Sequence, residues 1–289
     1  MSATLIDLSG RPDLRWLSRL VADIHVAAPR SEFVLAGAKA RDLLVTYAHN
    51  IPIDRVTEDV DLAFSVAGWD EFLSLRQALL ASGKFTEQGR MPHRIQHRGI
   101  GAARIDLIPF AGVEDAKRQI AWPPDGAMVM NVIGFREAYS AAIRVALPEA
   151  EWINVVPLYA LVLLKLAAWC DRRLTTPGKD AQDIRLFFKR YLEAGNQERL
   201  SAEASHLLDK PDFDFEAASA WLLGRDAGSL LRAPATGDAA RFFMKVVEQE
   251  VQARTESRLL ADMRSVTPKE DLRLLEEFHK GLQAGLSRS

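Results

Sequence analysis

Residues 57–64 read Thr-Glu-Asp-Val-Asp-Leu-Ala-Phe, a strand-like stretch that opens with acidic residues. The apolar run that begins at Val60 predicts a β-strand, and side chains two residues apart on a strand point to the same face of the sheet. Asp59 and Asp61 are therefore expected to present their carboxylates side by side. Because neighbouring carboxylates repel each other, the pair favours a bound cation or a shared proton.

A second acidic strand is predicted at residues 103–110, after a Gly-Ile-Gly turn that suggests a β-hairpin with residues 94–98. If this strand lies beside the first, Asp106 joins Asp59 and Asp61 on one sheet face. Oxygen ligands of this kind suit Mg²⁺, and three carboxylates are able to hold two ions for an in-line phosphoryl displacement. We hypothesise that all three are Mg²⁺ ligands and catalytic residues. The weaker interpretation is a chance Asp-x-Asp in which one member caps a turn.

A glycine turn precedes these acidic strands. The apolar segment 32–36 leads through Gly37 into a predicted helix at residues 38–48. Backbone N–H groups at such a turn are able to bind phosphate, and Lys39 and Arg41 would add positive charge. An ordinary strand-to-helix turn with surface cations would show the same pattern, so the turn is weak evidence by itself.

The chain changes character near residue 150. We expect an α+β domain at residues 1–152, with a mixed sheet flanked by helices, and an all-helical domain at residues 153–289. Apolar periodicity predicts the first domain's other helices and strands at 11–28, 69–82, 129–133 and 143–147. In the second domain it predicts helices at 157–173, 180–192, 201–208, 215–223, 239–264 and 268–286.

The predicted helix at 157–173 is apolar almost all round, yet it contains Lys165. A buried lysine costs several kcal/mol unless it is paired or loses its proton. One interpretation is that Lys165, assisted by Arg172, reaches across a cleft between the domains to a triphosphate; the other is that it extends outward along its aliphatic stem. Asp180 and Asp183 open the next helix, where an acidic residue often only compensates the helix dipole.

The order of these features resembles the DNA-polymerase-β-like nucleotidyltransferases. Over the whole chain it is most similar to the AbiEii abortive-infection toxin family, which has a glycine turn, Asp-x-Asp, Lys-Leu-x-Ala and a later aspartate. A serine that often follows the glycine in that family is replaced here by alanine. The matching stretches are Gly37-Ala38, Asp59-Val60-Asp61, Lys165-Leu166-Ala167-Ala168 and Lys179-Asp180.

The resemblance implies an enzyme that transfers a nucleoside monophosphate from an NTP to an acceptor hydroxyl with Mg²⁺. It suggests a tRNA 3′ end or a protein hydroxyl as acceptor, a neutralising antitoxin protein as partner, and a role in toxin–antitoxin phage defence. Lys165 and Asp180 are then catalytic, Asp180 either as general base or as an ion-pair partner that orients Lys165. The residues expected to bind the nucleotide are Gly37, Ala38, Lys39, Arg41 and Arg172.

Two other functions stay open: small-molecule nucleotidylation of the antibiotic-modifying type, and a non-catalytic nucleotide- or RNA-binding module. The formal charge of −2 excludes a globally basic nucleic-acid binder but allows a local basic patch. The candidates for such a patch are His93, Arg94, His97 and Arg98, although a charged hairpin edge explains them nearly as well. The single cysteine excludes an internal disulfide and a cysteine-based zinc site, and no apolar run is long enough to span a membrane. We expect a cytoplasmic protein.

Overall fold

The computed structural model describes residues 5–53, 59–89, 91–101, 103–176, 178–209, 211, 213–232 and 237–287. Thr57 and Glu58 of the acidic strand motif lie outside the described residues. The chain divides into two compact units, Met1–Pro157 and Leu158–Ser289, and each has its own core.

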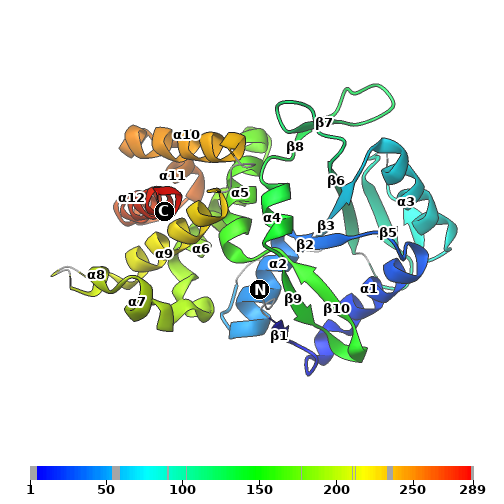
Figure 1. The fold of residues 1–289 in the computed structure, drawn as a ribbon, viewed down its shortest axis with the longest axis horizontal. Coiled ribbons are helices and arrows are strands. Elements are labelled where there is room, and N and C mark those ends of the chain that lie inside the picture. The colour runs from blue at the N-terminus through cyan, green and yellow to red at the C-terminus, as the bar shows by residue number, and fades with distance from the viewer. Residues whose placement is uncertain are drawn as a thin grey trace. The chain divides into compact units, whose positions relative to one another are not determined.

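In the described part of the first unit, a mixed sheet has the strand order β1-β9-β10-β2-β3-β6-β5-β4 (Figure 1). At its centre β3 and β6 run parallel, and they are flanked by antiparallel β2 and β5, as the predicted hairpin requires. A separate antiparallel pair is formed by β7 and β8. The strands are β1 Leu5–Asp7, β2 Phe33–Ala36, β3 Asp59–Val66, β4 Phe85–Glu87, β5 Arg94–His97, β6 Arg104–Ala111, β7 Gln119–Ala121, β8 Val129–Asn131, β9 Ile143–Ala146 and β10 Trp152–Val155.

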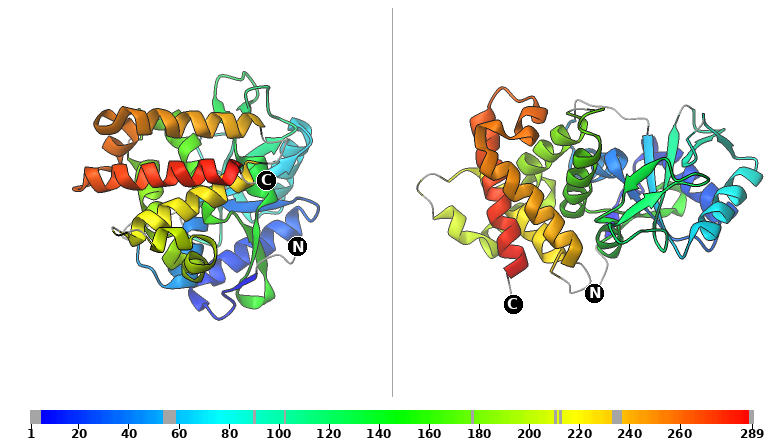
Figure 2. Two further views of the ribbon diagram at one scale, coloured as in Figure 1. Left: turned by 60° about the vertical axis from the view of Figure 1, so that its left-hand side comes forward. Right: turned by 90° about the horizontal axis from the view of Figure 1, so that it is seen from above.

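Helices α1 and α3 lie against each other beside the sheet (Figures 1 and 2). Helix α1 buries Leu17, Leu20, Val21 and Ile24, and the helical spacing of these residues is what predicted the helix. A short 3₁₀ turn takes the place of the first residues of the expected range. The helices of this unit are α1 Arg15–Ala27, α2 Gly37–Asp42, α3 Trp69–Ala81 and α4 Phe135–Ser140.

Strand β10 occupies the position where the sequence placed the start of the helical domain. It pairs with β9 on one side and with β2 on the other, and Ile153 and Val155 are buried. A strand of four residues is too short to show a clear alternation of apolar and polar side chains. The sequence pattern therefore did not predict β10 next to the strong helical pattern that follows it.

In the described part of the second unit, all the regular elements are helices, joined by turns and loops (Figure 2). Two of its predicted helices are wrong as single elements: 201–208 breaks at Ala204, and 239–264 breaks where the Ser257 side chain accepts the backbone N–H of Leu260 and starts a new helix. None of the helices in the described ranges is long and apolar enough to cross a membrane. The helices are α5 Leu158–Arg172, α6 Lys179–Arg190, α7 Gln197–Glu203, α8 Ser205–Leu208, α9 Phe215–Leu230, α10 Gly237–Ala253, α11 Arg258–Met263 and α12 Pro268–Ser287.

Helices α9 and α12 meet backbone to backbone through glycines. A Cβ atom at Gly281 of α12 would lie 2.0 Å from the Trp221 carbonyl oxygen on α9, and one at Gly224 of α9 would lie 2.1 Å from the Phe278 carbonyl oxygen. Gly228 and Gly285 make the same kind of approach one helical turn further along. Glycine is required at these positions because any side chain would push the two helices apart.

We expect Gly281→Ala to lower the free energy of unfolding by about 1–3 kcal/mol, the usual effect of forcing a methyl group into a packed interface. Gly237→Ala in α10 is the matched control, because the nearest atom to its added Cβ is the end of the Arg241 side chain at 3.6 Å. Urea denaturation of both variants measures the difference. Equal stabilities for Gly281→Ala and Gly237→Ala would contradict the close approach of α9 and α12.

Candidate active site

Strands β3 and β6 bring the three predicted aspartates to one sheet face. Parallel pairing places Asp61 directly opposite Asp106 and Asp59 opposite Arg104. The apolar residues that alternate with them are buried, whereas Asp59, Asp61 and Asp106 are half-buried on the other face. The burial of one face thus fixes which way the carboxylates point.

Arginines pair with Asp106 and Asp59. Arg94 of β5 makes a two-point ion pair with Asp106, with Nε to Oδ1 and Nη2 to Oδ2 both at 2.7 Å, and Arg104 Nε donates to Asp59 Oδ1 at 2.6 Å. The hydrogen bonds to Asp106 raise the pKa of Arg94 above its ordinary value, and the charges of all three aspartates add to the effect. The guanidinium groups therefore offset the mutual repulsion of the carboxylates.

His93 lies behind this group. Its Nε2 is 3.9 Å from Asp106 Oδ1, and its ring packs against Trp122 at 5.0 Å between centroids. Burial lowers the pKa of His93, against the opposing influence of Asp106. The lowered pKa keeps the His93 imidazole neutral at neutral pH, so His93 does not offset the negative charge of Asp106. Arg94 balances that charge, as any bound cation would.

The donor set fits Mg²⁺ in kind, since half-buried carboxylates on one face are the ligands this ion takes in proteins. In the described residues, however, no three His, Cys, Asp or Glu side chains are placed to hold a metal as they stand. Arg94 pairs with Asp106 and Arg104 pairs with Asp59, so a metal ion held by all three carboxylates would compete with these arginines.

The glycine turn lies against the acidic group. Gly37 has a φ of +65°, and a Cβ atom there would lie 1.8 Å from Asp61 Oδ2. Glycine is needed both for the left-handed conformation and for the close approach of the carboxylate. Ala38 follows as a buried residue of α2, so the turn predicted to bind phosphate is adjacent to the predicted metal ligands.

The two cations of this turn, Lys39 and Arg41, both contact other side chains of the protein. Lys39 lies over the Trp16 ring, with Nζ 5.3 Å from the centroid. Arg41 is only 1% exposed and donates from Nε to Asp42 Oδ1 at 3.0 Å, so the alternative of an ordinary turn with surface cations is wrong for Arg41, and its expected contact with the nucleotide stays a prediction.

In the helical unit, Lys165 is buried as its apolar helix predicts, and it is ion-paired. Its Nζ lies 3.2 Å from Asp180 Oδ1 and 2.6 Å from Asp183 Oδ2, and only 5% of the residue is exposed. The alternative in which the lysine extends outward is therefore wrong. The paired carboxylates provide what a buried ammonium group requires.

Arg172 completes this cluster from the end of α5. It donates from Nε to Asp180 Oδ2 at 2.7 Å and from Nη2 to Asp180 Oδ1 at 2.8 Å, while 44% of its side chain stays exposed. Burial alone would raise the pKa of Asp180, but the hydrogen bonds and charges of Arg172 and Lys165 hold it below its ordinary value. Asp180 is thus geometrically suited to orient two cations.

Three residues of these clusters were missed or undervalued by the sequence reasoning. Asp183 makes the shortest contact to Lys165, and its spacing of three residues from Asp180 on one helix was the available signal. Arg104 was not singled out, although it stands two residues before Asp106 on the same strand face. Arg94 was considered only as a phosphate ligand. Its pairing with Asp106 depends on the register of the β5–β6 hairpin, which the sequence pattern did not specify.

Two solved structures of ANT(2″)-Ia, one in complex with adenylyl-2″-tobramycin and one in solution, are each 16% identical to the chain. They cover 66% and 67% of this chain and 94% and 98% of their own, with TM-scores of 0.36 and 0.37. No curated protein matches the sequence at a significant level.

The family whose model matches the chain is one of nucleotidyltransferases. The family described as "Nucleotidyl transferase AbiEii toxin, Type IV TA system" matches residues 19–282. The chain belongs to this AbiEii family. The resemblance inferred from the four motifs is thereby confirmed.

We expect Gly37→Ala to abolish most nucleotidyl transfer, because the added methyl group would displace the Asp61 carboxylate. Gly83→Ala is the matched control: its φ is +73°, but nothing lies within 4 Å of the added Cβ. Both variants are expected to lose about 1 kcal/mol of stability from the left-handed conformation. Transfer assays at a temperature where both are folded then isolate the contact with Asp61. Equal activity in the two variants would show that this contact is unimportant.

We expect Arg172→Met to make the helical unit more sensitive to acid. Because the folded pKa of Asp180 is depressed, its contribution to stability is present above the unfolded pKa of about 3.9 and is lost as the pH falls through the lower folded value. Without Arg172, burial raises that pKa, so acid unfolding begins at a higher pH. Circular dichroism during acid titration measures the shift. Arg190→Met, which removes a surface pair with Glu193, should leave the midpoint unchanged.

Proposed function

We propose that the chain transfers a nucleoside monophosphate from an NTP to an acceptor hydroxyl, with Asp59, Asp61 and Asp106 as the Mg²⁺ ligands. The observation that supports this most strongly is the register that pairs Asp61 with Asp106 and places Asp59 on the same face. In the reaction, the acceptor oxygen forms a bond to the α-phosphorus, the bond from that phosphorus to the bridging oxygen breaks, and pyrophosphate and the hydroxyl proton leave.

When bound, Mg²⁺ would neutralise phosphate charge and lower the pKa of the acceptor hydroxyl. The protein's own groups then have separate tasks. Asp59, Asp61 and Asp106 supply negative oxygens on a rigid pair of strands, and the turn at Gly37 and Ala38 offers backbone N–H groups to the triphosphate. The buried turn keeps those N–H groups in place.

Arg94 and Arg104 balance the carboxylates in the absence of the nucleotide. Displaced from Asp106 and Asp59, their guanidinium groups would be available to bind phosphate oxygens, for which their planar geometry is suited. The same arginines would thus serve as counter-ions before the substrate binds and as substrate ligands afterwards.

In the helical unit, Arg172 is the cation of its cluster that is exposed enough to meet a phosphate. We assign Asp180 the role of orienting Arg172 and Lys165, rather than that of a general base, because both of its oxygens accept hydrogen bonds from these cations. Lys165 is enclosed with its carboxylate partners Asp180 and Asp183, and we keep it as a catalytic candidate of the helical unit.

We propose that the acceptor is a hydroxyl at a tRNA 3′ end or on a protein, and that the transfer makes the chain the toxin of a toxin–antitoxin pair. Membership of a family described as a type IV toxin supports this biological role and implies an antitoxin protein as partner. The cytoplasm is the compartment in which NTPs, tRNA and such a partner are available together.

We expect Asp61→Asn and Asp59→Asn to lower the rate of transfer by about two orders of magnitude or more, because each removes a negatively charged oxygen that would hold the Mg²⁺ ion at the reacting phosphate. The measurement uses α-labelled NTPs with Mg²⁺ and, in separate reactions, total tRNA or a protein extract. Asp70→Asn is the matched control, since Asp70 is an exposed residue in the first turn of α3. Full activity in the Asp61→Asn variant would exclude the assigned metal site, and labelling of neither acceptor would exclude the proposed transfer.

A further inference from the structure

His93 is a buried histidine that the proposed transfer does not use. Only 7% of the residue is exposed, and its Nδ1 has no hydrogen-bond partner in the described part of the chain. Its Nε2 lies 3.9 Å from Asp106 Oδ1, which is beyond hydrogen-bond range. Buried polar groups are nearly always hydrogen-bonded, so an imidazole left in this state beside an acidic site requires an explanation.

The backbone and the ring of His93 are both fixed by neighbouring residues. The His93 carbonyl oxygen accepts the backbone N–H of Leu107 at 2.9 Å, which ties His93 to the residue that follows Asp106. The imidazole ring packs on the buried ring of Trp122, at 5.0 Å between centroids, and Trp69 of α3 packs on the same tryptophan at 5.5 Å. His93 is therefore unable to move away from Asp106 without disturbing the core.

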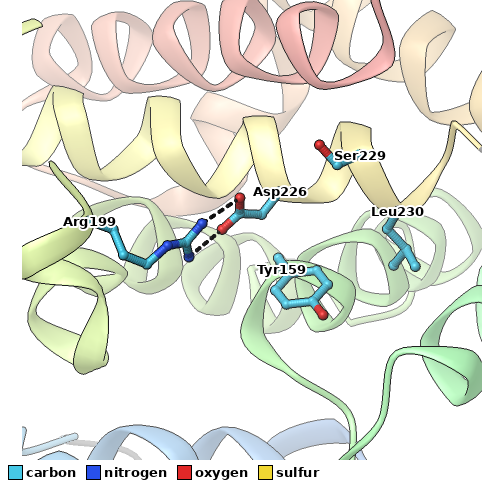
Figure 3. A pocket seen from close by; sticks show the side chains of 5 residues that line it. All are labelled: Tyr159, Arg199, Asp226, Ser229 and Leu230. Carbon is cyan, nitrogen blue, oxygen red and sulfur yellow. Dashed lines mark hydrogen bonds and ion pairs between the residues drawn. The ribbon is translucent and has the colours of Figure 1, made fainter. Parts of the chain in front are cut away.

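Asp226 of the helical unit shows that a carboxylate in a two-point arginine pair is still able to accept a bond from a neutral donor. Arg199 bonds to both of its oxygens, at 2.7 and 2.9 Å (Figure 3). The Tyr191 hydroxyl donates to Asp226 Oδ2 at 2.6 Å at the same time. The side chains of Asp226 and Asp106 are buried to a similar extent. An oxygen lone pair of Asp106 is therefore available to His93 even with an arginine bound.

Arg94, in contrast to His93, has room to leave Asp106, because 28% of its side chain is exposed. Its two bonds hold both carboxylate oxygens in one plane, and in this orientation Oδ1 stays 3.9 Å from His93 Nε2. The terminal torsion of an aspartate is broad, so a carboxylate released by the arginine is free to rotate. A small rotation then separates the present contact from a hydrogen bond to His93.

We propose that His93 is a positioning residue for Asp106: when Arg94 releases the carboxylate to a metal ion, His93 Nε2–H donates to Asp106 Oδ1 and fixes its orientation. This inference rests on the metal site of the proposed function. In a neutral imidazole one nitrogen donates and the other accepts, and the nearby carboxylate favours the proton on Nε2. Contacts of this kind, made to a metal ligand rather than to the metal, orient the ligand and raise the affinity of the site.

The test is a titration of the full chain with Mn²⁺ alone, in which electron paramagnetic resonance measures the free ion. Mn²⁺ takes the same oxygen ligands as Mg²⁺. We expect His93→Phe, which keeps the aromatic packing on Trp122, to weaken Mn²⁺ binding about tenfold to a hundredfold. His93→Gln restores an N–H donor and should recover part of the affinity. His97→Phe is the matched control, because His97 is also buried but bonds to Asp23, and it should leave the Mn²⁺ affinity unchanged.

Thermal melting of each variant first gives a temperature at which all of them are folded. Equal Mn²⁺ affinity in wild type and His93→Phe would overturn the proposal, and so would a His93→Gln variant that binds as weakly as His93→Phe. Long-range ¹⁵N–¹H NMR of the metal-free wild type is a second measurement that needs no variant. We expect the Nε2–H tautomer of His93, and the Nδ1–H tautomer would contradict the proposed donor.

Asp61→Asn separates a failure of this inference from a failure of the proposed function. We expect Asp61→Asn to weaken Mn²⁺ binding, because it removes a proposed ligand. If it does so and His93→Phe does not, the role of His93 alone is wrong. If Asp61→Asn keeps the wild-type affinity, or if the wild type binds no Mn²⁺, the metal site is wrong and the role of His93 is overturned with it.

Discussion

The parallel pairing of β3 with β6 is the constraint on which the first unit depends. Burial of Val60 and Leu62 on one strand, and of Ile105 and Leu107 on the other, fixes both strands in the register that aligns Asp61 with Asp106. A slip of one residue would exchange the apolar and acidic faces. The energy that stabilises the sheet therefore also assembles the acidic group.

In both units, basic side chains balance the charges of neighbouring aspartates. Arg94 and Arg104 balance aspartates on the sheet, and Lys165 and Arg172 balance Asp180 and Asp183 in the helical unit. Like charges brought together by folding would otherwise destabilise the native state. The difference lies in exposure, because the sheet group is half-buried and the Lys165 group is almost fully enclosed. The first is therefore easier for a substrate or ion to rearrange.

Sequence reasoning recovered the elements with strong periodicity and the motifs with fixed spacing. Helix α1 and the β5–β6 hairpin follow from local pattern, and the alternation on each strand predicts that Asp106 joins Asp61 once β3 and β6 are neighbours. Strand β10, the ion pairs of Arg94 and Arg104, and the burial of Arg41 depend on which strands become neighbours and which helix face turns inward. Tertiary packing decides which strands are neighbours and which helix faces are buried, and a short window of sequence carries no information on these long-range contacts.

The glycine contacts between α9 and α12 set an order of events during synthesis. Helix α9 leaves the ribosome well before α12, and its glycine face fits only another backbone at very close range. Until α12 emerges, the nascent helical unit lacks the element that closes its core. The helical unit of this nucleotidyltransferase is therefore able to close its core only after α12 has been synthesised.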